Sequence, residues 1–444
     1  MATLRFVTTQ RGHRKVILDG YIYLLDKTHG QKTYWRCEDR SCTSRLHTLG
    51  DSVVRPPSEH LSHAPSSSRV TKALVMSDVR RLALDSETST RNIVQQAIAD
   101  VPTLAAPAIP SNAALSQIVR RKRQRQLDDG DDEDGSCVIP RRLQYTADGQ
   151  RFLIHSGEIL IFASERALSV LAAADHWFVD GTFNVAPPGY TQLYTIHALL
   201  GESTAVPCVF ALLKDKSGTS YSTLLSHISD ASSRGLAPRS ILMDFEAAAI
   251  SAFRERFSHA TLKGCFYHLS QSIWRRVQEA GLQTRYAGDM EFALWCRCLP
   301  ALAFVPEGDI FQAFEALIDA PGFPRELDSV VDYFESNYIG NINRGGRRRQ
   351  PLFPPSLWTQ YQRTVDGLPR TNNSVEGWHN AFSGSINKAH PSVRALALRL
   401  QREEASMAAL SERLKAGDHP PMPHKKYRRV NERLKTVISG CKGA

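Results

Sequence analysis

Two aspartates near the middle of the chain stand where apolar, strand-like runs end. Asp180 follows Trp177-Phe178-Val179, and Asp244 follows Ile241-Leu242-Met243. Between the two aspartates, hydrophobic patterning predicts two more strands and a helix, over residues 192–200, 206–213 and 221–228. This order of elements can bring both aspartates side by side on one sheet. Two fixed carboxylates at one place are what a hard divalent cation such as Mg²⁺ needs.

A third carboxylate, Glu376, lies in a stretch with helical periodicity. Apolar residues recur there at the spacing i, i+3, i+7, which predicts one buried helix face. These residues are Val375, Trp378 and Phe382. The opposite face then presents Glu376, His379 and Asn380 together. A helix here would combine a carboxylate, an imidazole and an amide on one polar surface.

Each of the three carboxylates also has a purely structural explanation. Asp180-Gly181 between apolar runs is a strong hairpin-turn signal. Asp244 could cap the helix that follows it. Glu376 lies three residues after Asn373, which is the spacing of a capping box. Any one of them alone is more often structural, so the functional interpretation depends on the three together.

Four soft metal ligands occur close together near the N-terminus. Cys37 and Cys42 have the spacing C-x4-C, and His60 and His63 have the spacing H-x2-H. Two thiolates and two imidazoles suit tetrahedral Zn²⁺, and a unit of this size gains folding energy from a metal. The same stretch contains three strand-like runs, at residues 16–18, 21–25 and 33–36. The alternative is two buried cysteines and two surface histidines that coincide by chance.

Composition limits the class of protein. The 444 residues are 42% hydrophobic, as is typical of soluble globular proteins, and the net charge of +10 favours a polyanionic partner. The first thirty residues lack the apolar core of a signal peptide, and no apolar run is long enough to span a membrane. The eight cysteines are then expected to be reduced thiols or metal ligands. We expect a soluble intracellular protein with no membrane partner.

Residues 66–126 have three short helical patterns and end in a strongly basic run. The patterns fit either a helix-turn-helix reader of DNA or a spacer. The run over residues 120–125, which includes Lys122 and Arg123, could be a nuclear import signal, a phosphate-contacting patch or a solvated helix end. An acidic stretch over 128–134 follows, and its composition is typical of a flexible linker.

The rest of the chain is expected to be an α/β core interrupted by a helical insertion. A short strand near residue 262 ends in Cys265, with His268 close behind, and the two could position DNA, fill the core or bind metal with Cys296 or Cys298. An arginine-rich loop interrupts the insertion, and its side chains are candidate DNA contacts. They are Arg344, Arg347, Arg348 and Arg349.

Several short sequence motifs follow one another along this core. They are DGTF, QLYTI, a Val-Pro strand, MDFE followed by alanines, GCFYH and TNN-x-x-EGWH. Together they resemble the transposase domain of Mutator-like elements (MULE), over roughly residues 145–415. The N-terminal unit resembles a FLYWCH-type zinc finger, although that family usually ends in H-x-H, which leaves the first histidine ligand open.

The MULE resemblance implies an RNase H-like mixed sheet, flanked by helices, with an all-helical insertion before the last acidic residue. It also implies a DDE triad, which falls on Asp180, Asp244 and Glu376, and a C-x2-H word, which falls on Cys265 and His268. The expected domains are a small β-rich zinc finger over 1–65, a helical region over 66–126, a linker over 127–149, the core over 150–268, the insertion over 269–365, the last core helices over 366–413 and a basic tail over 414–444.

The function implied is a DDE-type transposase that cuts and joins DNA strands. Two Mg²⁺ or Mn²⁺ ions about 4 Å apart would serve this chemistry, and Zn²⁺ would serve the finger. The expected partners are double-stranded DNA, as terminal repeats and target, and further copies of the chain in a dimer or larger assembly. We expect such a protein in the nucleus. The alternative is a domesticated DNA-binding or chromatin protein that has kept the fold and lost catalysis.

Overall fold

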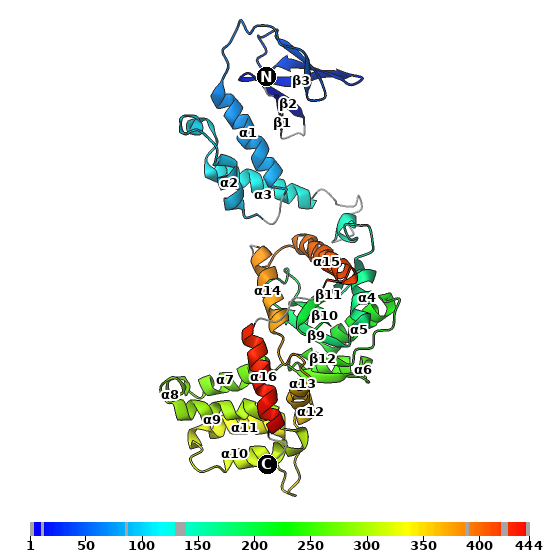
Figure 1. Ribbon diagram of the computed structural model, residues 1–444, viewed down its shortest axis with the longest axis vertical. Coiled ribbons are helices and arrows are strands. Elements are labelled where there is room, and N and C mark those ends of the chain that lie inside the picture. Colours follow the sequence, from blue (N-terminus) through cyan, green and yellow to red (C-terminus); the bar gives the residue numbers. More distant parts are fainter. Residues whose placement is uncertain are drawn as a thin grey trace. The chain divides into compact units, whose positions relative to one another are not determined.

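The computed structural model describes residues 4–9, 13–84, 88–128, 139–386, 390–418 and 425–440. The chain divides into two compact units, Met1–Asp131 and Asp132–Ala444, and each is considered by itself (Figure 1). Of the linker expected over 127–149, residues 129–138 fall outside the described residues, whereas Ile139 and Leu143 are buried in a core of the second unit. Within the described residues, no helix is both long and apolar enough to cross a membrane.

The described part of the first unit begins with a six-stranded antiparallel sheet in which every strand pairs with the next along the chain. The strands are β1 (Arg5–Thr8), β2 (Arg14–Leu18), β3 (Tyr21–His29), β4 (Lys32–Cys37), β5 (Arg45–Leu49) and β6 (Ser52–Arg55). Asp19 and Gly20 both have positive φ, 49° and 82°, as a tight hairpin turn requires. Trp35 and Tyr23 fill the small core.

The helices of this unit pack on one another and on the sheet. They are α1 (Ser67–Leu82), α2 (Thr90–Ile98) and α3 (Asn112–Asp128), with a 3-10 turn over Thr103–Ala108. Ser66 and Ser89 cap α1 and α2 by accepting backbone N–H groups. Val70 and Leu74 of α1 contact a buried cluster on β1–β3, so α1 joins the helices to the sheet.

The described part of the second unit is built on a seven-stranded mixed sheet in the order β13-β12-β9-β10-β11-β8-β7. Its strands are β7 (Leu153–Ser156), β8 (Leu160–Phe162), β9 (His176–Thr182), β10 (Gln192–Leu200), β11 (Thr204–Leu213), β12 (Ser240–Met243) and β13 (Thr261–Gly264). Strand β12 is parallel to both β9 and β13, and the other pairs are antiparallel. The expected α/β class is confirmed at this level.

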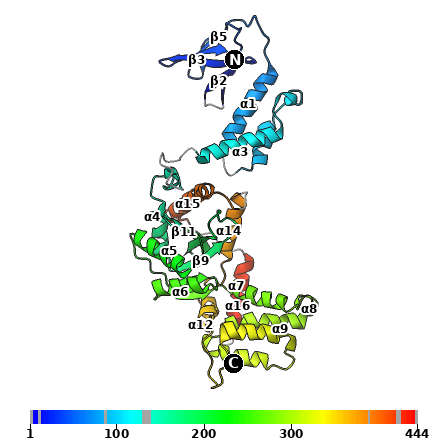
Figure 2. The same cartoon turned by 180° about the vertical axis from the view of Figure 1, so that it is seen from behind.

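Helices cover both faces of this sheet because its strands alternate between two apolar cores. One core includes residues of α4 (Glu165–Ala173), α5 (Gly218–Ala231) and α6 (Ala247–Arg256). Helices α5 and α6 lie side by side (Figure 2). The other core includes residues of α14 (Asn373–Ile386) and α15 (Val393–Lys415). Leu193 faces this second core and Tyr194 the first.

A helical segment separates β13 from α14 in the chain and shares its aromatic core with the sheet. Trp358 is fully buried there, and its Nε1 donates to the carbonyl of Tyr338 at 3.0 Å. The helices are α7 (Phe266–Glu279), α8 (Gln283–Gly288), α9 (Met290–Ala301), α10 (Ile310–Ile318), α11 (Asp328–Phe334), α12 (Pro355–Trp358) and α13 (Tyr361–Val365). In the tail, α16 (Lys425–Gly440) packs on α13.

Candidate functional sites

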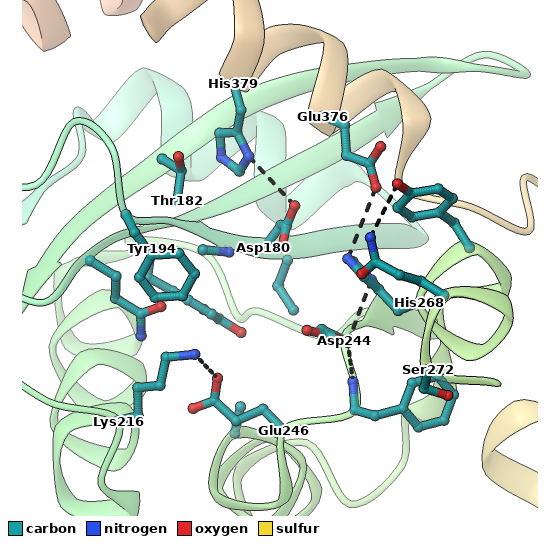
Figure 3. A pocket seen from close by; sticks show the side chains of 18 of the residues that line it. Asp180, Thr182, Tyr194, Lys216, Asp244, Glu246, His268, Ser272, Glu376 and His379 are labelled. Atoms are coloured by element: carbon teal, nitrogen blue, oxygen red, sulfur yellow. Dashed lines mark hydrogen bonds and ion pairs between the residues drawn. The ribbon is translucent and has the colours of Figure 1, made fainter. Parts of the chain in front are cut away.

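A polar cavity of about 720 Å³ in the second unit is lined by all three predicted carboxylates. Asp180 lies in β9, Asp244 directly after β12, and Glu376 in the first turn of α14 (Figure 3). The structure thus brings together residues from three separate parts of the chain.

The strand register explains why the two aspartates meet. Strands β9 and β12 are parallel neighbours, and Leu242 pairs with Phe178. Asp244 and Asp180 each lie two residues further along, so both emerge at the same edge of the sheet. The carboxyl ends of adjacent parallel strands are where open α/β sheets place their ligand sites.

Glu376 is partly buried, with a side-chain exposure between those of the buried Asp180 and the more exposed Asp244. Burial raises its pKa, as do the charges of Asp180 and Asp244, whereas His268 and His379 act in the opposite direction. Its Oε1 atom is buried and has no hydrogen-bond partner within the described part of the chain. The cavity that Asp180 and Asp244 line therefore also contains a buried carboxylate oxygen of Glu376 that has no protein partner.

His268, near the start of α7, lies between two of the carboxylates. Its Nδ1 is 3.5 Å from Asp244 Oδ1, and its Nε2 is 4.0 Å from Glu376 Oε1. Burial lowers its pKa, but a hydrogen bond to Cys265 and the charges of Cys265, Asp244 and Asp180 outweigh burial and raise it to about 9. An imidazolium at this place offsets the repulsion among the acids.

His379 is buried against Asp180 and does not lie on an exposed helix face. Its Nδ1 is 3.4 Å from Asp180 Oδ2, and its Nε2 is 3.1 Å from Thr195 Oγ1. That hydroxyl is in turn 2.9 Å from His197 Nε2. Burial holds the pKa of His197 well below its usual value, so this ring is neutral. The chain of contacts fixes α14 against β9 and β10.

Replacing His379 with alanine is expected to raise the Mn²⁺ concentration needed for half-maximal binding by about 10-fold or more. The physical reason is that Asp180 loses the neighbour that orients its carboxylate. Calorimetric titration with Mn²⁺ measures the change, with the exposed His259→Ala variant as the control. Equal Mn²⁺ affinity in the two variants would contradict a positioning role for His379.

A second polar network in the cavity was missed by reasoning from sequence. Tyr221 donates to Glu246 Oε1 at 2.5 Å, and Gln192 Nε2 donates to the Tyr221 hydroxyl at 2.8 Å. Lys216 Nζ donates to Glu246 Oε2 at 3.1 Å and lies 4.6 Å from the centre of the Phe183 ring. Glu246 belongs to the MDFE word, but only the fold reveals that Lys216 and Phe183 share its cavity.

The N-terminal unit holds a compact candidate zinc site. One ligand atom from each of Cys37, Cys42, His60 and His63 lies within 4.8 Å of the others, which is close enough to share a metal ion. Cys42 Sγ is 3.3 Å from His60 Nδ1, and Cys37 Sγ is 3.2 Å from His63 Nε2. Nδ1 of His60 and Nε2 of His63 are thus the nitrogens that face the two sulfurs and could bind a metal with them.

Two tyrosines orient His60 within this group. The Tyr23 hydroxyl lies 2.8 Å from His60 Nε2, and the Tyr21 ring stacks on the imidazole at 3.6 Å between ring centres. Burial lowers the pKa of His60, which favours the neutral ligating form. Burial raises the pKa of Cys37, and so does the neighbouring Cys42 thiol. A bound cation would stabilise the two thiolates, which otherwise repel each other, so the donor set fits Zn²⁺.

The predicted DNA-contacting residues differ in solvent exposure and in their ion pairs. Arg344, Arg347 and Arg349 are exposed, but Arg348 forms ion pairs with Glu315 at 2.6 Å and Glu335 at 3.0 Å. The guanidinium of Arg348 therefore links two parts of the helical insertion to the arginine-rich loop.

In the first unit, Lys122 is exposed, whereas Arg123 donates to the carbonyl of Thr88 at 2.6 Å and to that of Ala83 at 3.4 Å. Arg123 thereby ties α3 to the segment between α1 and α2. Of the predicted contacts in this unit, Lys122 is the one whose side chain faces solvent.

Two segments of the chain match known family models. Residues 6–61 match the FLYWCH zinc finger domain, and residues 176–272 match the MULE transposase domain. Both resemblances noted in the sequence are thereby confirmed. His63 and Glu376 lie outside the matched residues, so the structure alone joins them to their sites.

Other comparisons add little. No curated protein matches the chain. A solved structure described as the Drosophila P element transposase strand transfer complex is similar at 13% identity and a TM-score of 0.25. The matched region covers 85% of this chain and 92% of the P element transposase chain. A likeness this distant carries no argument about function.

Proposed function

We propose that the chain is a DDE-type transposase of the Mutator-like class that cuts and joins DNA strands. The observation that carries the proposal is Glu376, which lies far beyond the matched transposase domain and yet lines the same cavity as Asp180 and Asp244. A capping or turn role for each acid alone gives no reason for the three to converge.

The proposal includes an RNase H-like core. Three antiparallel strands, β9 to β11, followed by the parallel strands β12 and β13 on the β9 side, support that assignment. The insertion before Glu376 also has the place that the Mutator-like resemblance implies.

Asp180, Asp244 and Glu376 would together hold the metal ions in this proposal. Two such ions activate an attacking water or 3′-hydroxyl and stabilise the leaving oxygen. The protein's own part is to fix the acids through His379 and to balance their charge through His268. Lys216 and the exposed arginines would contact phosphates.

The partners in this proposal are the terminal repeats of an element and its target DNA. Two DNA ends must meet, so we propose a dimer or a larger assembly. The basic run over 120–125 would serve import into the nucleus, where the DNA lies. The zinc finger would add DNA contacts of its own.

Strand cleavage tests the proposal directly. Purified protein is incubated with a plasmid that carries the DNA flanking the gene, with Mg²⁺, with Mn²⁺ or with EDTA. Nicked or linear products that depend on metal are expected. Binding that weakens with salt and yields no product under any metal would overturn the enzyme and leave a non-catalytic DNA-binding protein.

Lys216→Ala is expected to weaken DNA binding and to reduce the slope of log K against log salt by about one. The reason is the loss of one phosphate contact at the cavity. Lys214→Ala is the matched control, because Lys214 also pairs with a glutamate, Glu158 at 2.8 Å, but does not line the cavity. Filter binding at several salt concentrations gives both slopes, and identical slopes would contradict the contact.

A further inference from the structure

We infer that Asn372 is a positioning residue that holds the three carboxylate-bearing segments in register, an inference that rests on the function proposed above. Asn372 is fully buried and directly precedes α14. It makes three hydrogen bonds, and each leads to the backbone beside a different carboxylate.

The first bond reaches the strand of Asp180. Asn372 Nδ2 donates to the carbonyl of Val179 at 3.3 Å, and Val179 is the residue before Asp180. The pairing of β9 with β12 ends at Phe178 and Leu242. The Val179 carbonyl therefore lies just past the last paired position, and the Asn372 amide takes the place of the missing strand partner.

The second bond reaches the segment of Asp244. The backbone N–H of Asn372 donates to Cys265 Sγ at 3.3 Å. The N–H of Cys265 donates in turn to the carbonyl of Met243, the residue before Asp244, at 2.8 Å. The neighbouring bond from Phe266 N–H to the Arg370 carbonyl, at 2.9 Å, holds the two segments alongside each other.

The third bond sets the helix of Glu376. The N–H of Glu376 donates to the Asn372 carbonyl at 2.8 Å, which closes the first turn of α14. Because all three bonds meet at one residue, a displacement of Asn372 moves Glu376 relative to both aspartates. His379, one turn further on, would move with it.

The other side-chain atom of Asn372 argues against a role in stability alone. Asn372 Oδ1 is buried and has no hydrogen-bond partner among the described residues. An unpaired buried acceptor costs about 1–3 kcal/mol, so an apolar side chain would suit a merely structural position better. What the asparagine supplies is a donor aimed at the strand end beside Asp180.

The test compares Asn372→Ala with Gln401→Ala in the full chain. Gln401 is the matched control because its Nε2 also donates to backbone carbonyls, those of Arg142 at 3.0 Å and Tyr145 at 2.6 Å, away from the cavity. Mn²⁺ alone is the probe, and the free-Mn²⁺ paramagnetic resonance signal reports binding. Asn372→Ala is expected to weaken Mn²⁺ binding by about 10–100-fold, with a loss in melting temperature similar to that of Gln401→Ala. Unchanged Mn²⁺ affinity would overturn the inference.

A second pair of variants guards against a simple failure to fold. Cys265→Ser keeps an acceptor for the Asn372 N–H, and Cys265→Ala removes it, at nearly the same volume. The serine variant is expected to bind Mn²⁺ more tightly than the alanine variant, and equal affinities would count against the second bond. Asp180-dependent Mn²⁺ binding without DNA cleavage by the wild-type protein would sink the proposed function and still leave the positioning role measurable.

Discussion

Asp244→Ala is expected to reduce metal-dependent strand cleavage by about 10³-fold or more. Loss of a metal ligand removes several kcal/mol of transition-state stabilisation, and each 1.36 kcal/mol is a factor of ten in rate. Asp180→Ala and Glu376→Ala should have effects of the same order, because the three carboxylates line one cavity. Quantified nicking of supercoiled plasmid in Mg²⁺ measures the loss.

Asp175→Ala is the control for these substitutions. Asp175 directly precedes β9 and is exposed, and it pairs with Arg239 at 3.5 Å, at the opposite end of the strand from Asp180. This variant should cleave like the wild type. Persistent cleavage by Asp244→Ala would mean that the second carboxylate is wrongly assigned, and loss in the control would point to a general defect in folding.

Removal of zinc is expected to unfold the N-terminal sheet of the intact chain. Metal binding and folding share one free energy in small zinc domains, on the order of 10–16 kcal/mol for zinc-finger peptides near neutral pH. The two buried clusters of this sheet are small, and one of them includes both cysteines, so little apolar burial remains to hold it without the metal. Chelation should therefore abolish the protection of its backbone amides from hydrogen exchange.

His63→Ala should give the same loss and should lower bound zinc from one ion per chain toward none. The control is His29→Ala, since His29 lies exposed at the end of β3 and is not one of the four clustered residues. Zinc content by atomic absorption and amide exchange by mass spectrometry give the two readouts. A sheet that keeps its protection after zinc is gone would contradict a structural metal.

Local patterns in the sequence were enough to place the main groups of the site. Apolar runs that end in an acid located Asp180 and Asp244, because a strand edge and its polar terminus are encoded within a few residues. Helical periodicity placed Glu376 in α14. Ligand spacing found the four residues of the zinc group, although it could not say which nitrogen of His60 faces the sulfurs.

The remaining features depend on contacts between distant residues, and no local pattern encodes them. His379 was assigned to a polar helix face, yet it is buried because Thr195 of β10 lies opposite it. In the sequence, Arg348 is indistinguishable from its neighbours in the arginine loop, but in the structure it pairs with the distant Glu315 and the nearer Glu335. Strands β7 and β8 are short, and their pairing with each other is irregular, so no clear sequence pattern marks them.

The late position of Glu376 in the chain has a consequence for protein synthesis. The ribosome delivers the zinc ligands and both aspartates well before it delivers α14, and contacts between residues so far apart form slowly. A chain released before residue 376 would carry the complete ligand set of the finger and an incomplete set of carboxylates. If the proposed function holds, such a fragment would bind DNA without cutting it and would compete with the intact protein.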